Sequence, residues 1–341
     1  MKAIYHPAQQ RHYPPHFLVN GVFEPNPEKP ERVERLLAGA RQAGCELRES
    51  PDLGRAPIEA VHSVAYLDFL QRAHERWRRI EGAAPAVTPN IHPDCRAVGY
   101  PASVVAQAGY HMTDASAPIA EDTWESSCRS AWSAAQAARL VLAGEPSAYA
   151  LCRPPGHHAF SDMAGGFCYL NNGAIAAQKL RSAHRCVAIL DVDLHHGNGT
   201  QSIFYRRDDV LTVSIHADPR RFYPFFWGYA EETGEDDGEG YNFNFPLPRG
   251  SGDSVFLAAL DTAIERIQAY SPGALVLALG LDAFEGDPFG GLSLTTGGFR
   301  EIARRVAARL ALPTVIVQEG GYLCDALGDN LAAFLEGFQH G

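Results

Sequence analysis

Short apolar runs and longer segments with helical periodicity alternate along the chain from residue 123 onward. The apolar runs are continuous rather than alternating with polar residues, which is typical of strands buried on both faces of a parallel sheet. Apolar residues recur at helical spacing between several of the runs, and Gly144 ends the first helical segment. The pattern predicts strands at 147–152, 186–190, 210–215, 274–279 and 314–317, and helices at 123–143, 172–184, 254–270 and 297–311.

This alternation predicts the α/β fold class, with a parallel sheet covered by helices on both faces. The residues before 123 contain few long periodic segments. Prolines recur between residues 82 and 122, so we expect an irregular excursion there rather than a helix. These prolines are Pro85, Pro89, Pro93, Pro101 and Pro118. An acidic run at 231–239 predicts a solvated loop.

Each apolar run is followed at once by polar or glycine-rich residues of unusual composition. Open parallel sheets bind ligands beyond the carboxyl ends of their strands. We therefore expect five segments that are distant in the sequence to build one site at one rim of the sheet. The segments are 153–158, 191–199, 216–218, 280–285 and 319–322.

Asp191, Asp193 and His195 alternate along the chain, and alternate side chains of a strand share one face. Such a motif could also be a polar strand end at the surface, but Asp282 at a second strand end favours a metal site. We predict that Asp193, His195 and Asp282 bind one catalytic zinc ion, although the donor set also suits ferrous iron. Three protein ligands leave a position for water and substrate.

His157-His158 and Tyr322 are the other candidates for chemistry. Adjacent histidines are expected by chance in this chain, but these two follow a strand and the stiff Pro154-Pro155-Gly156 segment. Imidazole titrates near neutral pH, so a histidine at a metal site can hold and move protons. Tyr322 is either a rim aromatic or a hydroxyl donor to an oxyanion. Similarly, 165–167 and 222–224 are either ordinary turns or the walls of a narrow apolar channel.

The composition narrows the partners. The formal net charge of −11 argues against nucleic acid and anionic membranes and favours cationic or neutral ligands. The amino terminus lacks a signal-peptide core, and no run is long enough to cross a membrane. The seven cysteines are scattered without a Cys-x-x-Cys pair. They indicate reduced thiols, and we expect a cytoplasmic protein.

Five ordered motifs between about 150 and 325 resemble those of the histone deacetylase superfamily. The segment Ser161-Asp162-Met163, the segment Gly228–Gly234 and the irregular stretch at 82–122 most resemble the bacterial acetylpolyamine amidohydrolases within it. The motifs are Arg153-Pro-Pro-Gly-His-His158, Gly166-Phe-Cys-Tyr-Leu-Asn-Asn172, Asp191-Val-Asp-Leu-His-His-Gly-Asn-Gly199, Gly280-Leu-Asp-Ala-Phe284 and Glu319-Gly-Gly-Tyr322.

The resemblance implies an arginase–deacetylase fold. This is one catalytic domain, 1–341, around a single eight-stranded parallel sheet, with an insertion near 82–122. It makes Asp193, His195 and Asp282 the zinc ligands and His158 the general base and then acid. It implies that Asp191 orients His157, which assists electrostatically, and that Tyr322 polarises the scissile carbonyl. Asn198 stands where some relatives carry an aspartate behind the second histidine, and an amide cannot stabilise imidazolium as a carboxylate does.

The resemblance also implies structural potassium, with Asp191 and Ser214 at one site. Backbone carbonyls near Phe204, Arg207, Val210 and Tyr241 would form a second site. The insertion implies a homodimer with a narrowed entrance.

The expected activity is zinc-dependent removal of acetyl groups from acetylated polyamines or similar small acylated amines. Gly166, Phe167 and Tyr223 would line the substrate channel. The acidic groups Asp114, Glu24 and 231–239 either draw the cation inward or only confer solubility. Three alternatives stay open: a protein acetyl-lysine deacetylase, a ureohydrolase with paired metals, and an inactive protein that binds acyl amines.

Overall fold

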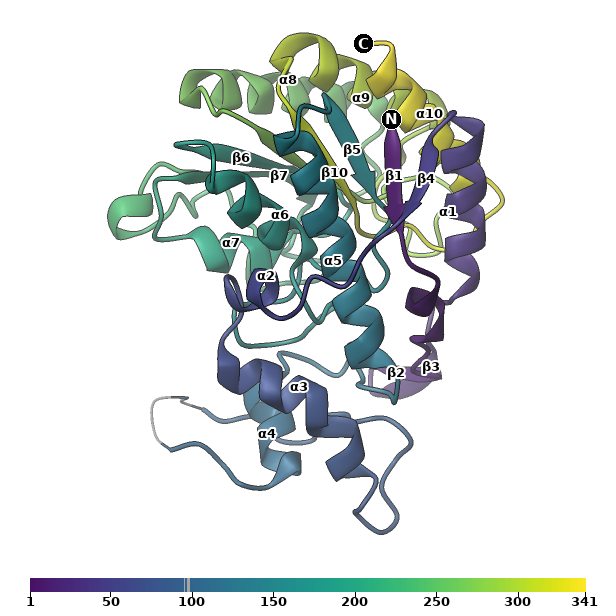
Figure 1. Ribbon diagram of the computed structural model, residues 1–341, viewed down its shortest axis with the longest axis vertical. Coiled ribbons are helices and arrows are strands. Elements are labelled where there is room, and N and C mark those ends of the chain that lie inside the picture. Colours follow the sequence, from purple (N-terminus) through teal and green to yellow (C-terminus); the bar gives the residue numbers. More distant parts are fainter. Residues whose placement is uncertain (95, 97–98) are drawn as a thin grey trace.

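The structure is a computed structural model that describes residues 1–94, 96 and 99–341 (Figure 1). Its centre is an eight-stranded sheet in which every pairing is parallel, and this confirms the α/β class and the single eight-stranded parallel sheet. The strands lie in the order β4 (Glu46–Glu49), β1 (Lys2–Tyr5), β5 (Ser147–Ala150), β10 (Thr314–Gln318), β9 (Leu275–Leu279), β6 (Val187–Asp191), β7 (Val210–Ala217) and β8 (Asn242–Leu247).

The five strands expected from the apolar runs are the five consecutive central strands, β5, β10, β9, β6 and β7. The three strands without such a signal, β4, β1 and β8, lie toward the edges of the sheet. They are short or alternate with polar residues, because a strand near an edge is not buried on both faces. A separate antiparallel hairpin of β2 (His16–Val19) and β3 (Val22–Pro25) lies outside the main sheet.

Helices cover both faces of the sheet (Figure 1). Alternate residues of one strand enter different cores: Val187 and Ile189 of β6 pack in one, Ala188 and Leu190 in the other. The first core holds α5 (Thr123–Leu142), α6 (Asn172–Arg181) and α7 (Asn198–Phe204). The second holds α1 (Glu31–Gln42), α8 (Asp253–Tyr270), α9 (Thr296–Leu310) and α10 (Leu327–Gln339).

The prediction of an excursion without a helix at 82–122 was wrong for α4 (Val104–His111). The chain has no proline between Pro101 and Pro118, and the Ser103 side chain accepts a hydrogen bond from Val105 N, which caps the helix. α4 packs with α3 (Val64–Trp77), which also gave no clear signal, in a third apolar cluster that projects below the sheet (Figure 1). The short helix α2 (Ala56–Glu59) precedes α3.

No helix in the described part of the chain is long and apolar enough to cross a membrane. The six cysteines that the structure describes are all free thiols, and Cys95 lies outside the described residues.

Candidate active site

The sheet order brings the two metal-site segments together. β6 and β9 are neighbours, with Asp191 in register with Ala278, so the residues after both strands meet at one rim. Leu194 N donates to Asp282 Oδ1 at 3.1 Å, which joins the two strand ends directly. Gly320 N, after β10, donates to Asp193 Oδ2 at 2.8 Å. Three strand ends are thus connected through the carboxylates themselves.

Asp193, His195 and Asp282 converge as the sequence predicted. One ligand atom from each lies within 4.8 Å of the others, and all three residues are buried. His195 Nδ1 lies 3.1 Å from Asp282 Oδ2 and 3.3 Å from Asp193 Oδ1. A Cβ at Gly320 would collide with both carboxylates, so glycine leaves the space that the ligand oxygens need.

This donor set fits a divalent cation. Burial raises the pKa of Asp282, and the nearby Asp193 carboxylate raises it further, because two buried negative charges repel each other. A bound cation removes that repulsion. Two carboxylate oxygens and an imidazole nitrogen suit zinc or ferrous iron.

Asp191 orients His157. His157 Nδ1 lies 3.0 Å from Asp191 Oδ2, and both side chains are buried. Burial lowers the pKa of His157, but the Asp193 and Asp191 carboxylates outweigh that effect and raise the pKa to about 10. The ring therefore favours the charged form in the protein without a metal.

His158 lies in the opposite electrostatic environment. Burial and the neighbouring His157 lower its pKa well below the usual value, so the ring is neutral at pH 7. Its Nδ1 lies 2.7 Å from Asn198 Oδ1, which accepts the Nδ1 proton. The lone pair of His158 is consequently on Nε2. Asn198 fixes the tautomer without adding a charge.

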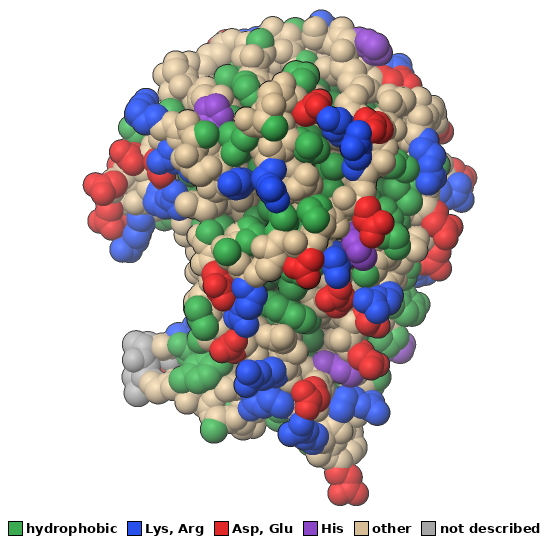
Figure 2. Space-filling model, viewed as in Figure 1, with side chains coloured by type: hydrophobic (Ala, Val, Ile, Leu, Met, Phe, Trp, Pro, Cys, Tyr) green, Lys and Arg blue, Asp and Glu red, His purple; other side chains and the backbone are tan. Residues whose placement is uncertain are grey.

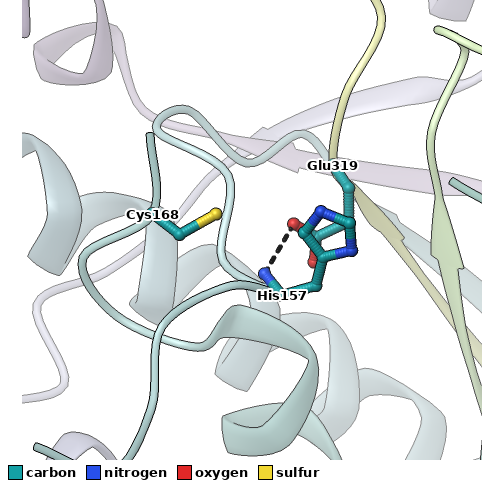
Figure 3. A group of neighbouring side chains, drawn as sticks. All are labelled: His157, Cys168 and Glu319. Carbon is teal, nitrogen blue, oxygen red and sulfur yellow. Dashed lines mark hydrogen bonds between the residues drawn. The ribbon is translucent and has the colours of Figure 1, made fainter. Parts of the chain in front are cut away.

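The buried carboxylate of Glu319 holds the loop that carries both histidines. Its Oε2 accepts hydrogen bonds from Gly156 N at 2.6 Å and His157 N at 3.0 Å. Figure 3 shows the bond to the His157 backbone, with the Cys168 sulfur facing the same group. Since His157 Nδ1 is occupied by Asp191, we interpret this second cluster as structural support. Sequence reasoning gave Glu319 no role of its own.

Tyr322 is positioned by Asp287. Tyr322 N donates to Asp287 Oδ2 at 2.9 Å, while Asp287 Oδ1 accepts from Phe289 N at 2.9 Å. The Phe289 and Tyr322 rings pack 4.6 Å apart, centre to centre. Burial raises the pKa of Tyr322 well above 10, so its hydroxyl stays protonated and can donate. Asp287 is a second positioning residue that the sequence analysis missed.

The three metal-site residues, both histidines and Tyr322 line one cavity of about 790 Å³. Gly166, Phe167, Tyr223 and Asp114, the predicted substrate-binding residues, all line it. Phe222 stacks on the His195 ring at 5.2 Å, and Tyr223 contacts His158 edge-on at 4.9 Å. Gly166, Phe167 and the segment 222–224 therefore form walls of this cavity.

The acidic groups proposed to attract a cation are not all at the cavity. Asp114 lines it and accepts a hydrogen bond from the Tyr223 hydroxyl at 2.6 Å. Glu24 is exposed on the β2–β3 hairpin and is outside the lining, as is the acidic run at 231–239.

The interpretation of 231–239 as a solvated loop was wrong for Glu232. Glu232 Oε2 accepts hydrogen bonds from Gln201 Nε2 at 2.7 Å, Gly228 N at 2.9 Å and Asn244 Nδ2 at 3.3 Å. These donors come from α7, from Gly228 at the end of the aromatic segment 222–228, and from β8. Glu232 thus anchors the end of the aromatic wall segment 222–228 to the body of the protein, and its donors could not be found from the local sequence.

Two of the predicted potassium-site residues lie side by side. Asp191 and Ser214 are paired across β6 and β7 and line one small cavity. Ser214 Oγ lies 2.8 Å from His216 Nδ1. Phe204, Arg207, Val210 and Tyr241 surround the connection from α7 to β7, where Phe204 O accepts from Arg207 N and Tyr241 O accepts from Thr212 N.

Comparisons with known proteins agree with this architecture. A histone deacetylase domain model matches residues 26–338. The chain is 47% identical to an acetylpolyamine amidohydrolase of Burkholderia pseudomallei, covering 99% of this chain and 98% of that protein. It is 44% identical to acetylpolyamine amidohydrolase 1 of Pseudomonas aeruginosa, covering 99% of each. A crystal structure of the acetylpolyamine aminohydrolase from Burkholderia pseudomallei superposes with a TM-score of 0.96 at 47% identity, covering 99% of this chain and 98% of that one.

The chain belongs to the histone deacetylase family, and it is a deacetylase, a hydrolase of acyl–nitrogen bonds. Bacterial acetylpolyamine amidohydrolases match it over nearly its full length.

The role of Glu232 can be tested with Glu232→Gln. The Gln amide would place an N–H group where Glu232 now accepts hydrogen bonds from three donors. We therefore expect segment 222–228 to be held less firmly, at a free-energy cost of about 1–2 kcal/mol. KM for a small acetylated amine should rise roughly 5- to 30-fold while kcat changes little. The control is Glu231→Gln at the exposed neighbouring position. Equal KM values for the two variants, measured by acetate release, would contradict this role.

Proposed function

We propose that the protein hydrolyses the acetyl amide of acetylated polyamines or similar small acylated amines, using one bound zinc ion. The observation that carries the proposal is the convergence of Asp193, His195 and Asp282 below a cavity walled by Phe222, Tyr223 and Phe167. Such a channel suits a slim acylated chain. The relatives named acetylpolyamine amidohydrolases support the same substrate class.

His158 is the proposed general base. Its neutral ring and the lone pair on Nε2 allow it to take a proton from the attacking water. A divalent cation at the Asp193–His195–Asp282 site would lower the pKa of a bound water and polarise the acetyl carbonyl. His158 then returns the proton to the leaving amine nitrogen. His157, held by Asp191, assists through its position beside the same carboxylates.

Tyr322 is the proposed oxyanion donor. Its protonated hydroxyl lines the base of the cavity, where negative charge develops on the acetyl oxygen. Asp287 fixes its backbone and the Phe289 ring packs against it. The donor is therefore in place before the substrate arrives.

We propose further that zinc is the bound metal, with ferrous iron as the alternative. Potassium would occupy the site of Asp191 and Ser214 and a second site formed by backbone carbonyls near Phe204 and Tyr241. The match of the family model to 26–338 supports one catalytic domain.

The insertion near 82–122, with Ile91 and Tyr100 exposed, is the proposed contact of a homodimer. Nucleic acids and membranes are not expected partners.

A substrate panel on zinc-loaded protein tests the proposed function. We expect faster acetate release, as kcat/KM, from N-acetylputrescine and acetylspermidine than from an acetyl-lysine peptide. A clear preference for the peptide would favour the protein deacetylase alternative. Urea release from a guanidino substrate, or no turnover of any acyl amine, would favour the ureohydrolase or the inactive binding protein.

Tyr322→Phe should lower kcat about 100- to 1000-fold, because one oxyanion donor is lost from a water-excluded site. Zinc content, measured by elemental analysis, should not change, since the hydroxyl is not part of the ligand set. The control is Tyr13→Phe, at a tyrosine whose side chain is exposed. Retention of wild-type turnover by Tyr322→Phe would exclude this role.

A further inference from the structure

The mouth of the active-site cavity carries two arginines. Outside the metal centre and the histidines, the charged residues in the cavity lining are Asp114, Arg221 and Arg249. The abundant carboxylates of the 231–239 run do not contribute to the lining. The cavity lining therefore bears two exposed arginines and one part-buried carboxylate, although the whole chain has a net charge of −11.

Both arginines are connected to aromatic residues of the cavity walls. Arg221 directly precedes Phe222, whose ring stacks on His195 at 5.2 Å. Arg249 Nε donates to Gly290 O at 3.3 Å, and Gly290 directly follows Phe289, whose ring lies 5.5 Å from the His195 ring. Arg221 is thus the chain neighbour of one ring that contacts His195, and Arg249 is hydrogen-bonded to the chain neighbour of the other, so both belong to the same cavity lining.

Neither guanidinium group is held by a carboxylate of the described residues, although Arg249 Nε donates to Gly290 O. Both side chains are exposed, and neither forms an ion pair within the described part of the chain. The neighbouring Arg220, in contrast, is paired with Asp218. Asp114 comes from a different segment and already accepts the Tyr223 hydroxyl. The mouth is consequently a complement for a substrate tail that carries a carboxylate together with an ammonium group.

We propose that the site also accepts diamino acids acetylated on the side-chain nitrogen, with the α-carboxylate bound by Arg221 and Arg249 and the α-ammonium facing Asp114. This inference rests on the proposed deacetylase site. Water adds to the acetyl carbon, the carbon–nitrogen bond breaks and the proton passes to the amine, which yields acetate and the free diamino acid. Arginine suits this role because its planar fork can bind a carboxylate through two parallel hydrogen bonds.

A matched pair of substrates isolates the carboxylate. Nδ-acetylornithine and N-acetylputrescine differ only by the carboxylate on the carbon that bears the free amine. The zinc-loaded enzyme is assayed on both, as wild type, Arg221→Gln, Arg249→Gln and the double variant. Arg220→Gln is the control at an exposed arginine outside the cavity lining.

We expect wild type to hydrolyse both compounds. Each single variant should lower kcat/KM for Nδ-acetylornithine about 3- to 10-fold through KM, a size typical of a partly exposed charged contact. The double variant should lose more, while its kcat/KM for N-acetylputrescine should rise about 2-fold, because a positive charge near the cationic tail is removed. Arg220→Gln should leave the ratio between the two substrates at its wild-type value.

Two results separate this inference from the proposed function. Turnover of N-acetylputrescine without turnover of Nδ-acetylornithine would overturn the inference and leave the function standing. So would equal losses on both substrates in the double variant. Absence of turnover on both compounds by wild type would instead contradict the proposed function.

Discussion

The crowding of buried carboxylates at the ends of β6 and β9 is the constraint on which the site depends. Asp193 and Asp282 are withdrawn from water and converge on one point with His195. Burying like charges together is costly unless a cation or donors compensate them. Backbone N–H groups of Leu194 and Gly320 compensate part of the charge and fix the geometry. A divalent cation is the partner that this arrangement best fits, and the adjacency of β6 and β9 makes the arrangement possible.

The reacting groups around that point are held by partners from other segments. Asp191 holds His157 and Asn198 holds His158. The Asp193 and Asp191 carboxylates raise the pKa of His157, while burial and the neighbouring His157 lower the pKa of His158. Glu319 supports the histidine loop from the end of β10, three residues before Tyr322. The loop that carries His157 and His158 and the loop that carries Tyr322 are therefore connected through one buried carboxylate.

The sequence predicted what is encoded by local pattern. Continuous apolar runs identified the five central strands, and polar residues at their ends identified the side chains that converge at the cavity. The edge strands and α4 were missed because their patterns are short or masked by nearby prolines. Glu232 and Asp287 could not be recognised, since their hydrogen-bond donors include backbone N–H groups, which look alike in any sequence. The two arginines of the cavity lining, Arg221 and Arg249, could not be recognised from the sequence, because only the folded chain brings them to one cavity.

The most direct measurement is a zinc titration of protein freed of metal by chelation, followed by calorimetry, for wild type, Asp282→Asn and the exposed control Asp325→Asn. We expect one tightly bound zinc ion per chain in wild type and in the control. In Asp282→Asn the affinity should fall at least about 100-fold, because one of three charged or imidazole ligands is lost. Wild-type affinity in Asp282→Asn, or two equivalent zinc ions per wild-type chain, would contradict it.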